Sequence, residues 1–260
     1  MTKLLISIAL LSLLPFEAFA ETPEQKGLEI VVEADRRDQG WEDSKASMKM
    51  ILRNRQGETS ERQIRTRILE VQGDGDKSMT IFDRPADVRN TAFLSYTHAV
   101  KPDDQWLYLP ALKRVKRIAS ANKSGPFMGS EFAYEDISSQ EVEKYSYKWL
   151  RDDTFDGQEA YVVERVPQYK HSGYTKQEAW IDKAYYRVLK VDYYDRKGSL
   201  LKTLVASDFK LYLDKYWRAN RMDMENHLNG KSTTLMWSDY EFRNGYTERD
   251  FDRNSLKRAK

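Results

Sequence analysis

The sequence contains no cysteine among its 260 residues. This absence excludes disulfide bonds, thiolate nucleophiles and metal sites built from thiolates. It also excludes a lipid anchor attached to an N-terminal cysteine. The fold therefore has to be stabilised by its apolar core, and a chain of this length can bury a core large enough for that purpose.

Histidine is also scarce, and the residues His98, His171 and His227 are too far apart in sequence to match a metal-ligand spacing. No nucleophile elbow, zinc-protease motif or Walker loop is present. We interpret the carboxylate pairs Glu135-Asp136 and Asp152-Asp153 as solvated turn residues rather than a glycosidase-like dyad. The sequence thus predicts no catalytic residue, no metal site and no cofactor.

Long apolar runs are absent except at the N-terminus. Lys3 precedes an apolar run over residues 4–14, and small residues stand at Ala18 and Ala20. This layout predicts a signal peptide over residues 1–20, cleaved after Ala20, and one mature domain over residues 21–260. A membrane anchor is the alternative, but a spanning helix needs about 20 apolar residues. We expect a soluble protein of the periplasm of a Gram-negative bacterium.

A dominant charge of one sign is lacking as well, because the formal net charge is only +2. A nucleic-acid-binding domain would carry a strong basic field, so this class of protein is disfavoured.

What the sequence does contain is a two-residue alternation of polar and apolar side chains, beginning near Ala46 and recurring almost to the C-terminus. Turn signals such as Asn229-Gly230 separate the alternating segments. We count about eleven candidate strands and no Gly-rich βαβ unit, which predicts an all-β barrel or sandwich. Residues 27–34 allow a helix, but we favour an ordered N-terminal arm. A short helix is expected over residues 251–257.

The most distinctive stretch runs over residues 104–136. It opens with an aromatic segment containing Trp106 and Tyr108, which ends at Pro110. A basic segment follows, and its members are Lys113, Arg114, Lys116 and Arg117. We expect these cations to meet an anionic head group, a membrane surface or an acidic transporter face. A solvated strand face is the alternative.

Two large apolar residues, Phe127 and Met128, then stand between Gly125-Pro126 and Gly129, where no regular element would obviously bury them. We interpret them as lid residues over an apolar cavity, together with Phe132. Ser130 could begin a short helix over residues 132–135. The proposed cavity residues are accordingly Trp106, Tyr108, Phe127, Met128 and Phe132. An ordinary hairpin with a basic outer face is the alternative for the whole stretch.

Several motifs resemble the family of outer-membrane lipoprotein-sorting-protein-like proteins, which is similar to the periplasmic lipoprotein carrier LolA. They are DQWLYLPALKRVKRI, GSEFAYED, WIDK, YYDRKGSLLKTL, GKSTTLMWSDYEF and FDRNSLKR. The resemblance covers residues 46–257. It implies a mainly β fold with a half-open, strongly curved antiparallel sheet, an incomplete barrel, whose concave face is plugged by short helices. It also implies a cavity for acyl chains and a partnership with a resistance-nodulation-division (RND) exporter.

Our leading hypothesis is therefore a periplasmic carrier of a lipid or an acylated lipoprotein, without enzymatic activity. The alternative is an accessory subunit that docks a membrane transporter or an envelope assembly. An envelope enzyme that acts on a glycan or a lipid is the third hypothesis.

Overall fold

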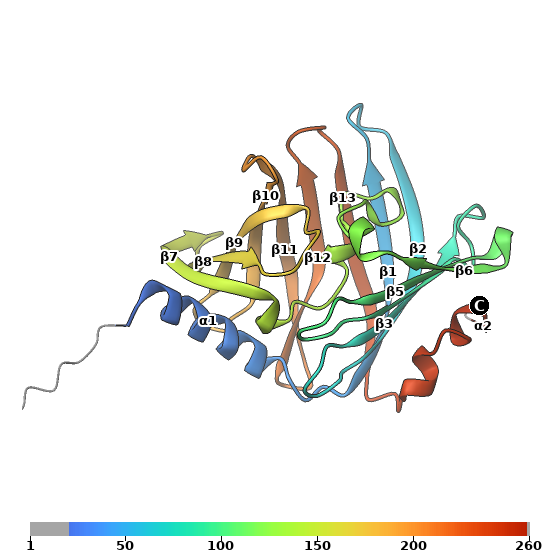
Figure 1. Cartoon of the computed structure of the whole chain (residues 1–260), viewed down its shortest axis with the longest axis horizontal. Coiled ribbons are helices and arrows are strands. Elements are labelled where there is room, and N and C mark those ends of the chain that lie inside the picture. Colours follow the sequence, from blue (N-terminus) through green and yellow to red (C-terminus); the bar gives the residue numbers. More distant parts are fainter. Residues whose placement is uncertain (1–20, 259–260) are drawn as a thin grey trace, which may run out of the picture.

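The structure, a computed structural model, describes residues 21–258, so the predicted signal peptide lies outside the described residues. One antiparallel sheet of thirteen strands dominates it, in the order β6-β5-β4-β3-β2-β1-β13-β12-β11-β10-β9-β8-β7 (Figure 1). The strands are β1 (Asp43–Arg53), β2 (Thr59–Leu69), β3 (Lys77–Arg84), β4 (Ala92–Tyr96), β5 (Asp104–Leu109), β6 (Arg114–Ile118), β7 (Tyr145–Phe155), β8 (Gln158–Pro167), β9 (Tyr174–Asp182), β10 (Val188–Asp195), β11 (Leu200–Tyr212), β12 (Tyr216–Asn226) and β13 (Ser232–Phe242). The sheet does not close, because β6 and β7 are both edge strands. The predicted half-open antiparallel sheet is confirmed.

Alternation along the strands separates two faces of the sheet. In β8, Tyr161 and Val163 belong to the main apolar cluster, whereas Ala160 and Val162 belong to a second cluster on the opposite face. This follows from the pleat, which points successive side chains to opposite sides. The main cluster lies on the concave face, and the sheet curves around it (Figure 1). Register shifts in several strand pairs, as between Trp149 and Arg151, add to the twist and bending of the sheet.

Helix α1 (Pro23–Arg37) covers the β7 end of the sheet (Figure 1). Thr22 caps the helix by accepting a hydrogen bond from the backbone N–H of Gln25, and the Gln25 side chain accepts from the N–H of Thr22. This is a capping box followed by proline at the first helical position, a strong start signal. The expectation of a non-helical arm was therefore wrong: the signal lies in Thr22-Pro23-Glu24-Gln25, just before the weak apolar pattern of residues 27–34. Within residues 21–258, no helix has the length and apolar character needed to cross a membrane.

The connection between β6 and β7 spans residues 119–144, and we call it the plug segment. Since β6 and β7 are opposite edges of the sheet, this connection must cross from one end of the sheet to the other. It does so in short 3₁₀ turns: η2 (Ser120–Asn122), η3 (Phe127–Gly129), η4 (Tyr134–Asp136) and η5 (Val142–Lys144). The strand order requires a long connection across the sheet, and the burial of Phe127 and Phe132 in the main cluster places it over the concave face.

The C-terminal turns η6 (Glu248–Phe251) and α2 (Ser255–Arg258) cover a different surface. Phe251 and Leu256 are fully buried there against Met79, Ile81 and Leu94 of β3 and β4. Ile81 and Phe82 are neighbours in β3 but lie in different clusters, so this third cluster is on the convex side, and we call it the convex cluster. The predicted C-terminal helix is thus present only as two short turns.

Candidate functional site

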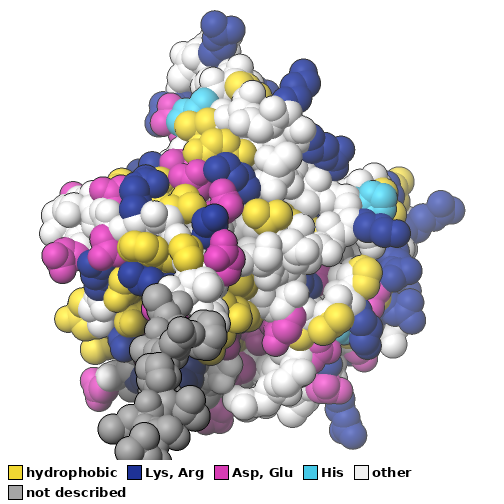
Figure 2. Space-filling model, turned by 60° about the vertical axis from the view of Figure 1, so that its left-hand side comes forward, with side chains coloured by type: hydrophobic (Ala, Val, Ile, Leu, Met, Phe, Trp, Pro, Cys, Tyr) yellow, Lys and Arg dark blue, Asp and Glu magenta, His cyan; other side chains and the backbone are white. Residues whose placement is uncertain are grey.

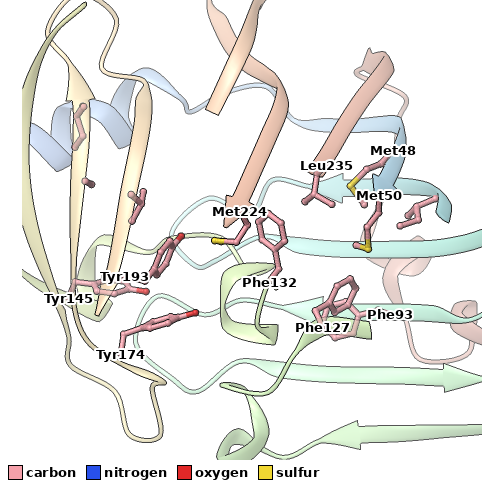
Figure 3. Packing of buried hydrophobic residues seen from close by; sticks show 14 of the residues in the cluster. Met48, Met50, Phe93, Phe127, Phe132, Tyr145, Tyr174, Tyr193, Met224 and Leu235 are labelled. Carbon is pink, nitrogen blue, oxygen red and sulfur yellow. The ribbon is translucent and has the colours of Figure 1, made fainter. Parts of the chain in front are cut away.

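The plug segment inserts aromatic side chains into the concave face. Phe127 is fully buried, with its ring centroid 5.1 Å from that of Phe93 and 6.1 Å from that of Phe82. Phe132 is also buried, and Figure 3 shows it between Met224 and the Phe127–Phe93 pair. Met128 is half-buried and packs against the same cluster. Three of the five residues expected at the cavity therefore come together on the concave face.

Trp106 and Tyr108 lie elsewhere. In β5 they alternate with Leu107, and only Leu107 belongs to the concave cluster. Trp106 stacks edge-on against Tyr96, and both Trp106 and Tyr108 pack into the convex cluster beneath the C-terminal turns. The sequence pattern identified the aromatic segment but could not show which side of the strand faces the cavity. In the structure, Trp106 and Tyr108 are on the convex side and are not part of the concave site.

The basic segment is likewise divided between the two faces. Across the β5–β6 pair, Lys116 lies opposite Leu107 on the concave side, whereas Arg117 lies opposite Trp106 on the convex side. Arg114 shares the side of Lys116, because residues two apart share a face. Lys113 lies in the preceding turn with a positive φ of 47°. Arg117 pairs with Asp104, and the other three side chains are exposed at the edge of the sheet.

The carboxylate pair Glu135-Asp136 is buried, so its interpretation as a solvated turn was wrong. Glu135 accepts hydrogen bonds from Tyr169 Oη (3.0 Å), Ser172 Oγ (2.9 Å) and the N–H of Gly173 (2.8 Å). Burial raises the pKa of Glu135, and these donors oppose that effect. A carboxylate in an apolar surrounding needs such partners to remain charged.

Asp136 links the plug segment to the sheet through a buried ion pair. Its Oδ2 lies 2.6 Å from Lys202 Nζ of β11, and the side chains of both residues are only 4% exposed. Tyr174 Oη donates to the same carboxylate at 2.9 Å. Lys202 also donates to the carbonyl oxygen of Glu131, and the Glu131 side chain accepts from Asn226. We call the Asp136–Lys202 pair the latch.

Both ends of the plug segment are attached to a single buried carboxylate. Asp103, just before β5, pairs with Lys123 near the start of the plug segment at 3.3 Å and with Lys144 at its end. The middle of the segment is held by Arg62, which donates to the carbonyl oxygen of Met128. These polar contacts add to the packing of Phe127 and Phe132, and an irregular segment of this kind can open locally while the sheet beneath it stays folded.

Polar side chains cross the otherwise apolar concave face in one line. Strand register places the following residues directly opposite one another on successive strands from β7 to β12, and we call them the polar row: Tyr147, Arg165, Gln177, Tyr193, Lys202 and Asn226. Every member is buried. Lys202 and Asn226 have partners in the plug segment. The sequence could not show this row, because its members are brought together only by the register of six strands.

Two hollows remain beside the plug segment. One, of about 630 Å³, opens between the plug segment and the β10–β11 and β12–β13 turns, where Arg196, Lys197 and Lys231 line it. The other, of about 650 Å³, lies between α1 and the sheet. Its apolar lining includes Val31, Ile181, Val188 and Met222, all of which pack in the concave cluster. Both volumes are within the range of roughly 300–1,000 Å³ that is usual for ligand sites.

Side chains of both charges line the second hollow, with carboxylates in excess. Asp35, Asp38, Glu70, Asp76 and Glu141 all line it. Burial, together with the nearby charges of Glu141, Glu70 and Asp38, raises the pKa of Asp76 to about 7. Across the described part of the chain, no group of three or more histidine, cysteine, aspartate or glutamate side chains is arranged to hold a metal ion.

The comparisons with known proteins place the chain in a family. The sequence model of a family described as "Uncharacterized protein" matches residues 74–258. A solved domain from Vibrio parahaemolyticus, whose description assigns it to outer membrane lipoprotein-sorting proteins, is 61% identical, with a TM-score of 0.89 over 90% of this chain and 99% of that chain. A DUF1329 family protein from Desulfovibrio piger is 32% identical, with a TM-score of 0.85 and the same coverage.

A LolA superfamily protein from Nitrosomonas europaea shares the fold at 21% identity, with a TM-score of 0.71 over 88% of this chain and 98% of that chain. The comparison with curated proteins gave no match. The half-open sheet, its plugged concave face and the identity to the solved domains agree with the resemblance seen in the sequence. The chain belongs to the outer-membrane lipoprotein-sorting-protein-like family, with a LolA-like fold.

Proposed function

We propose that this protein is a periplasmic carrier that shields the acyl chains of a lipid or lipoprotein on its concave face during transfer toward the outer membrane. The observation that carries the proposal is an apolar concave face closed by an irregular segment, which is attached through buried aromatic side chains and through a few buried ion pairs. The lipoprotein-sorting description of the Vibrio parahaemolyticus relative supports the same class of cargo.

Burial of the cargo supplies the affinity without any chemical step. Each methylene that leaves water contributes about 0.8 kcal/mol, so a long acyl chain binds tightly to an apolar surface alone. Phe127 and Phe132 now occupy the centre of the concave face, as Figure 3 shows. Cargo would displace these rings, of which Phe132 already lines the hollow beside the β10–β11 and β12–β13 turns, and the plug segment would return when the cargo leaves.

The first test is direct. The protein is purified from cells and extracted with organic solvent, and the extract is analysed by mass spectrometry while the emptied protein is titrated with a fluorescent acyl probe. Co-purified lipid and saturable uptake are expected. The absence of both would reject the carrier function.

A matched pair of methionine substitutions tests where the cargo binds. Met222 lines the hollow beside α1, whereas Met236 of the neighbouring strand is 39% exposed. Met222→Gln should weaken probe binding at least several-fold, because it places an amide among apolar groups. Met236→Gln should bind as the parent does. Equal affinities in the two variants would place the site elsewhere.

We further propose an RND-type exporter as the partner that delivers or receives the cargo. The exposed cations Lys113, Arg114 and Lys116 at the β6 edge would face an acidic surface of that partner or anionic head groups. Charges of both signs, interspersed with apolar patches, cover the face drawn in Figure 2, so that face as a whole does not indicate a binding surface. The group of cations at the β6 edge is the more specific indication of one.

A photo-crosslinker at Lys116 tests this contact in cells, with one at exposed Lys210 as control. An accessory subunit would crosslink while its concave face holds no lipid.

A further inference from the structure

The polar row contains one charged side chain without a partner. Arg165 of β8 is 7% exposed, and its Nε has no hydrogen-bond partner among the described residues. Its guanidinium forms no ion pair with any described carboxylate, although it lines the hollow beside α1. The other buried cation of the row, Lys202, is paired with Asp136. Lys202 therefore has the counter-charge that a buried cation needs, and Arg165 does not.

A guanidinium stays charged at any physiological pH, so Arg165 cannot avoid the cost of burial by losing its proton. A buried charge normally has a counter-charge and filled hydrogen-bonding positions. The uncompensated charge at Arg165 thus indicates that its partner is a molecule other than the described chain.

Gln177, the neighbour of Arg165 in the row, also has a polar atom without a hydrogen-bond partner. Gln177 lies directly opposite on β9 and is 2% exposed, and its Oε1 has no partner either. A hydrogen bond between the two side chains would satisfy these two atoms, but it would leave the positive charge without a counter-charge. Because Oε1 is an acceptor, it can take an N–H from Arg165, which leaves the amide Nε2 of Gln177 and the remaining guanidinium N–H groups as donors to an oxyanion.

Carboxylates are in excess in the hollow that Arg165 lines, but the immediate neighbours of the Arg165–Gln177 pair in the row are tyrosines. Tyr147 lies opposite Arg165 on β7, and Tyr193 lies opposite Gln177 on β10. Burial raises the pKa of Tyr145 to about 12, and the charge of Arg165 nearby opposes this effect. The apolar residues Ile181 and Val188 line the same hollow and would accept the alkyl chain. Polar and apolar requirements are thus met within one cavity.

We propose that Arg165 and Gln177 bind the oxyanion of the cargo, a carboxylate or phosphate group attached to an alkyl chain. This inference rests on the proposed carrier function and names the chemistry that the same site selects. A planar guanidinium can bind either oxyanion through two parallel N–H donors.

The test uses the chain over residues 21–260 and probes of equal chain length. Binding of palmitate, hexadecyl phosphate and neutral hexadecanol is measured by calorimetry, with inorganic phosphate alone as a fourth probe. The parent protein should prefer palmitate, hexadecyl phosphate or both over hexadecanol by roughly 10- to 100-fold, the effect of a hydrogen-bonded charge pair. The preferred probe identifies the source of the oxyanion.

In Arg165→Met this preference should fall to near unity while hexadecanol still binds with the parent affinity. Gln177→Leu should lower it by a smaller factor, which keeps the test decisive if the arginine variant does not fold. Arg37→Met is the matched control, because Arg37 lines the same hollow but is paired with Glu33 at 2.7 Å; its preference should stay unchanged.

Two results would overturn the inference: equal binding of the charged and neutral probes by the parent protein, or an undiminished preference in both Arg165→Met and Gln177→Leu. Failure of the carrier function looks different, since then none of the alkyl probes would bind. Binding of inorganic phosphate that is lost in Arg165→Met would in that case support the anion site alone.

Discussion

Lys202 on β11 and Asp136 in the plug segment form an ion pair of 2.6 Å that is almost closed to solvent. The pair joins the centre of the sheet to the segment that covers it. Removal of one partner from such a pair leaves a buried charge uncompensated, whereas removal of both does not.

The first prediction concerns this latch. Asp136→Asn should lower the free energy of unfolding by about 3–5 kcal/mol and increase the initial rate of acyl-probe uptake, because the plug segment loses its main attachment. Urea unfolding and stopped-flow fluorescence measure the two effects. Glu241→Gln breaks the exposed Lys45–Glu241 pair and should cost less than about 1 kcal/mol. An unchanged uptake rate in Asp136→Asn would show that the plug segment is not gated by the latch.

The second prediction is a pH dependence from Asp76. Its pKa in the folded protein, about 7, is above the ordinary value of 3.8, so between these values the folded state holds a proton that the unfolded state has released. Stability from this group is therefore greatest at low pH and decreases as pH rises toward 7. Asp76→Asn removes the effect, so its stability relative to the parent should improve by on the order of 2–4 kcal/mol between pH 5 and pH 8.

Urea unfolding at the two pH values tests this, with exposed Asp87→Asn as the control. Both variants lose one carboxylate, but only the buried one should change the slope. The same slope in the parent and in Asp76→Asn would contradict the prediction.

The third prediction concerns Gly27, where replacement by alanine should destabilise the protein although alanine usually stabilises a helix. Gly27 of α1 lies so close to β7 that a Cβ would come within 2.6 Å of the backbone nitrogen of Trp149. Alanine at a free helix position stabilises by about 1 kcal/mol, but Gly27→Ala should destabilise by about 1–3 kcal/mol because α1 must move off the sheet. Chemical denaturation measures the sign. Glu29→Ala on the exposed side of α1 should change stability by less than about 0.5 kcal/mol, and a stabilising Gly27→Ala would refute the contact.

The fourth prediction separates the two faces of β5. Trp106→Ala should lower stability by on the order of 1–3 kcal/mol, because the ring packs beneath the C-terminal turns, yet leave probe affinity unchanged. Leu107→Ala removes a similar contact on the concave face and should weaken probe binding as well. Thermal unfolding and probe titration of the two neighbours provide the comparison. Loss of binding in Trp106→Ala would return that residue to the site.

The sequence predicted more of the fold than of the site. Alternation such as that of Met48 and Met50 identified the strands, and turns such as Asn229-Gly230 marked their ends, because both signals are local. Phe127 was recognised as unusual because glycine and proline flank a large ring. Helix α1 was not predicted because its apolar pattern is weak, although Thr22 and Gln25 form a capping box that marks its start.

Local patterns could not give the direction of the pleat or the register between distant strands. Trp106 and Tyr108 were proposed as cavity residues, because alternation shows which residues share a side of a strand but not which side faces the cavity. The burial of Glu135 and Asp136 escaped notice for a related reason, because their partners Gly173 and Lys202 are distant in sequence.

The sequence by itself determined an antiparallel β protein without thiol chemistry, with an irregular apolar segment at its centre. Only the tertiary structure decided that this segment closes the concave face, because β6 and β7 became opposite edges of one open sheet. It also decided that Arg165 and Gln177 lie opposite each other on β8 and β9, each with a buried polar atom that has no partner among the described residues. The physical reason is that strand pairing is a long-range property: each side chain is placed by its own strand, but its neighbours come from the register with other strands.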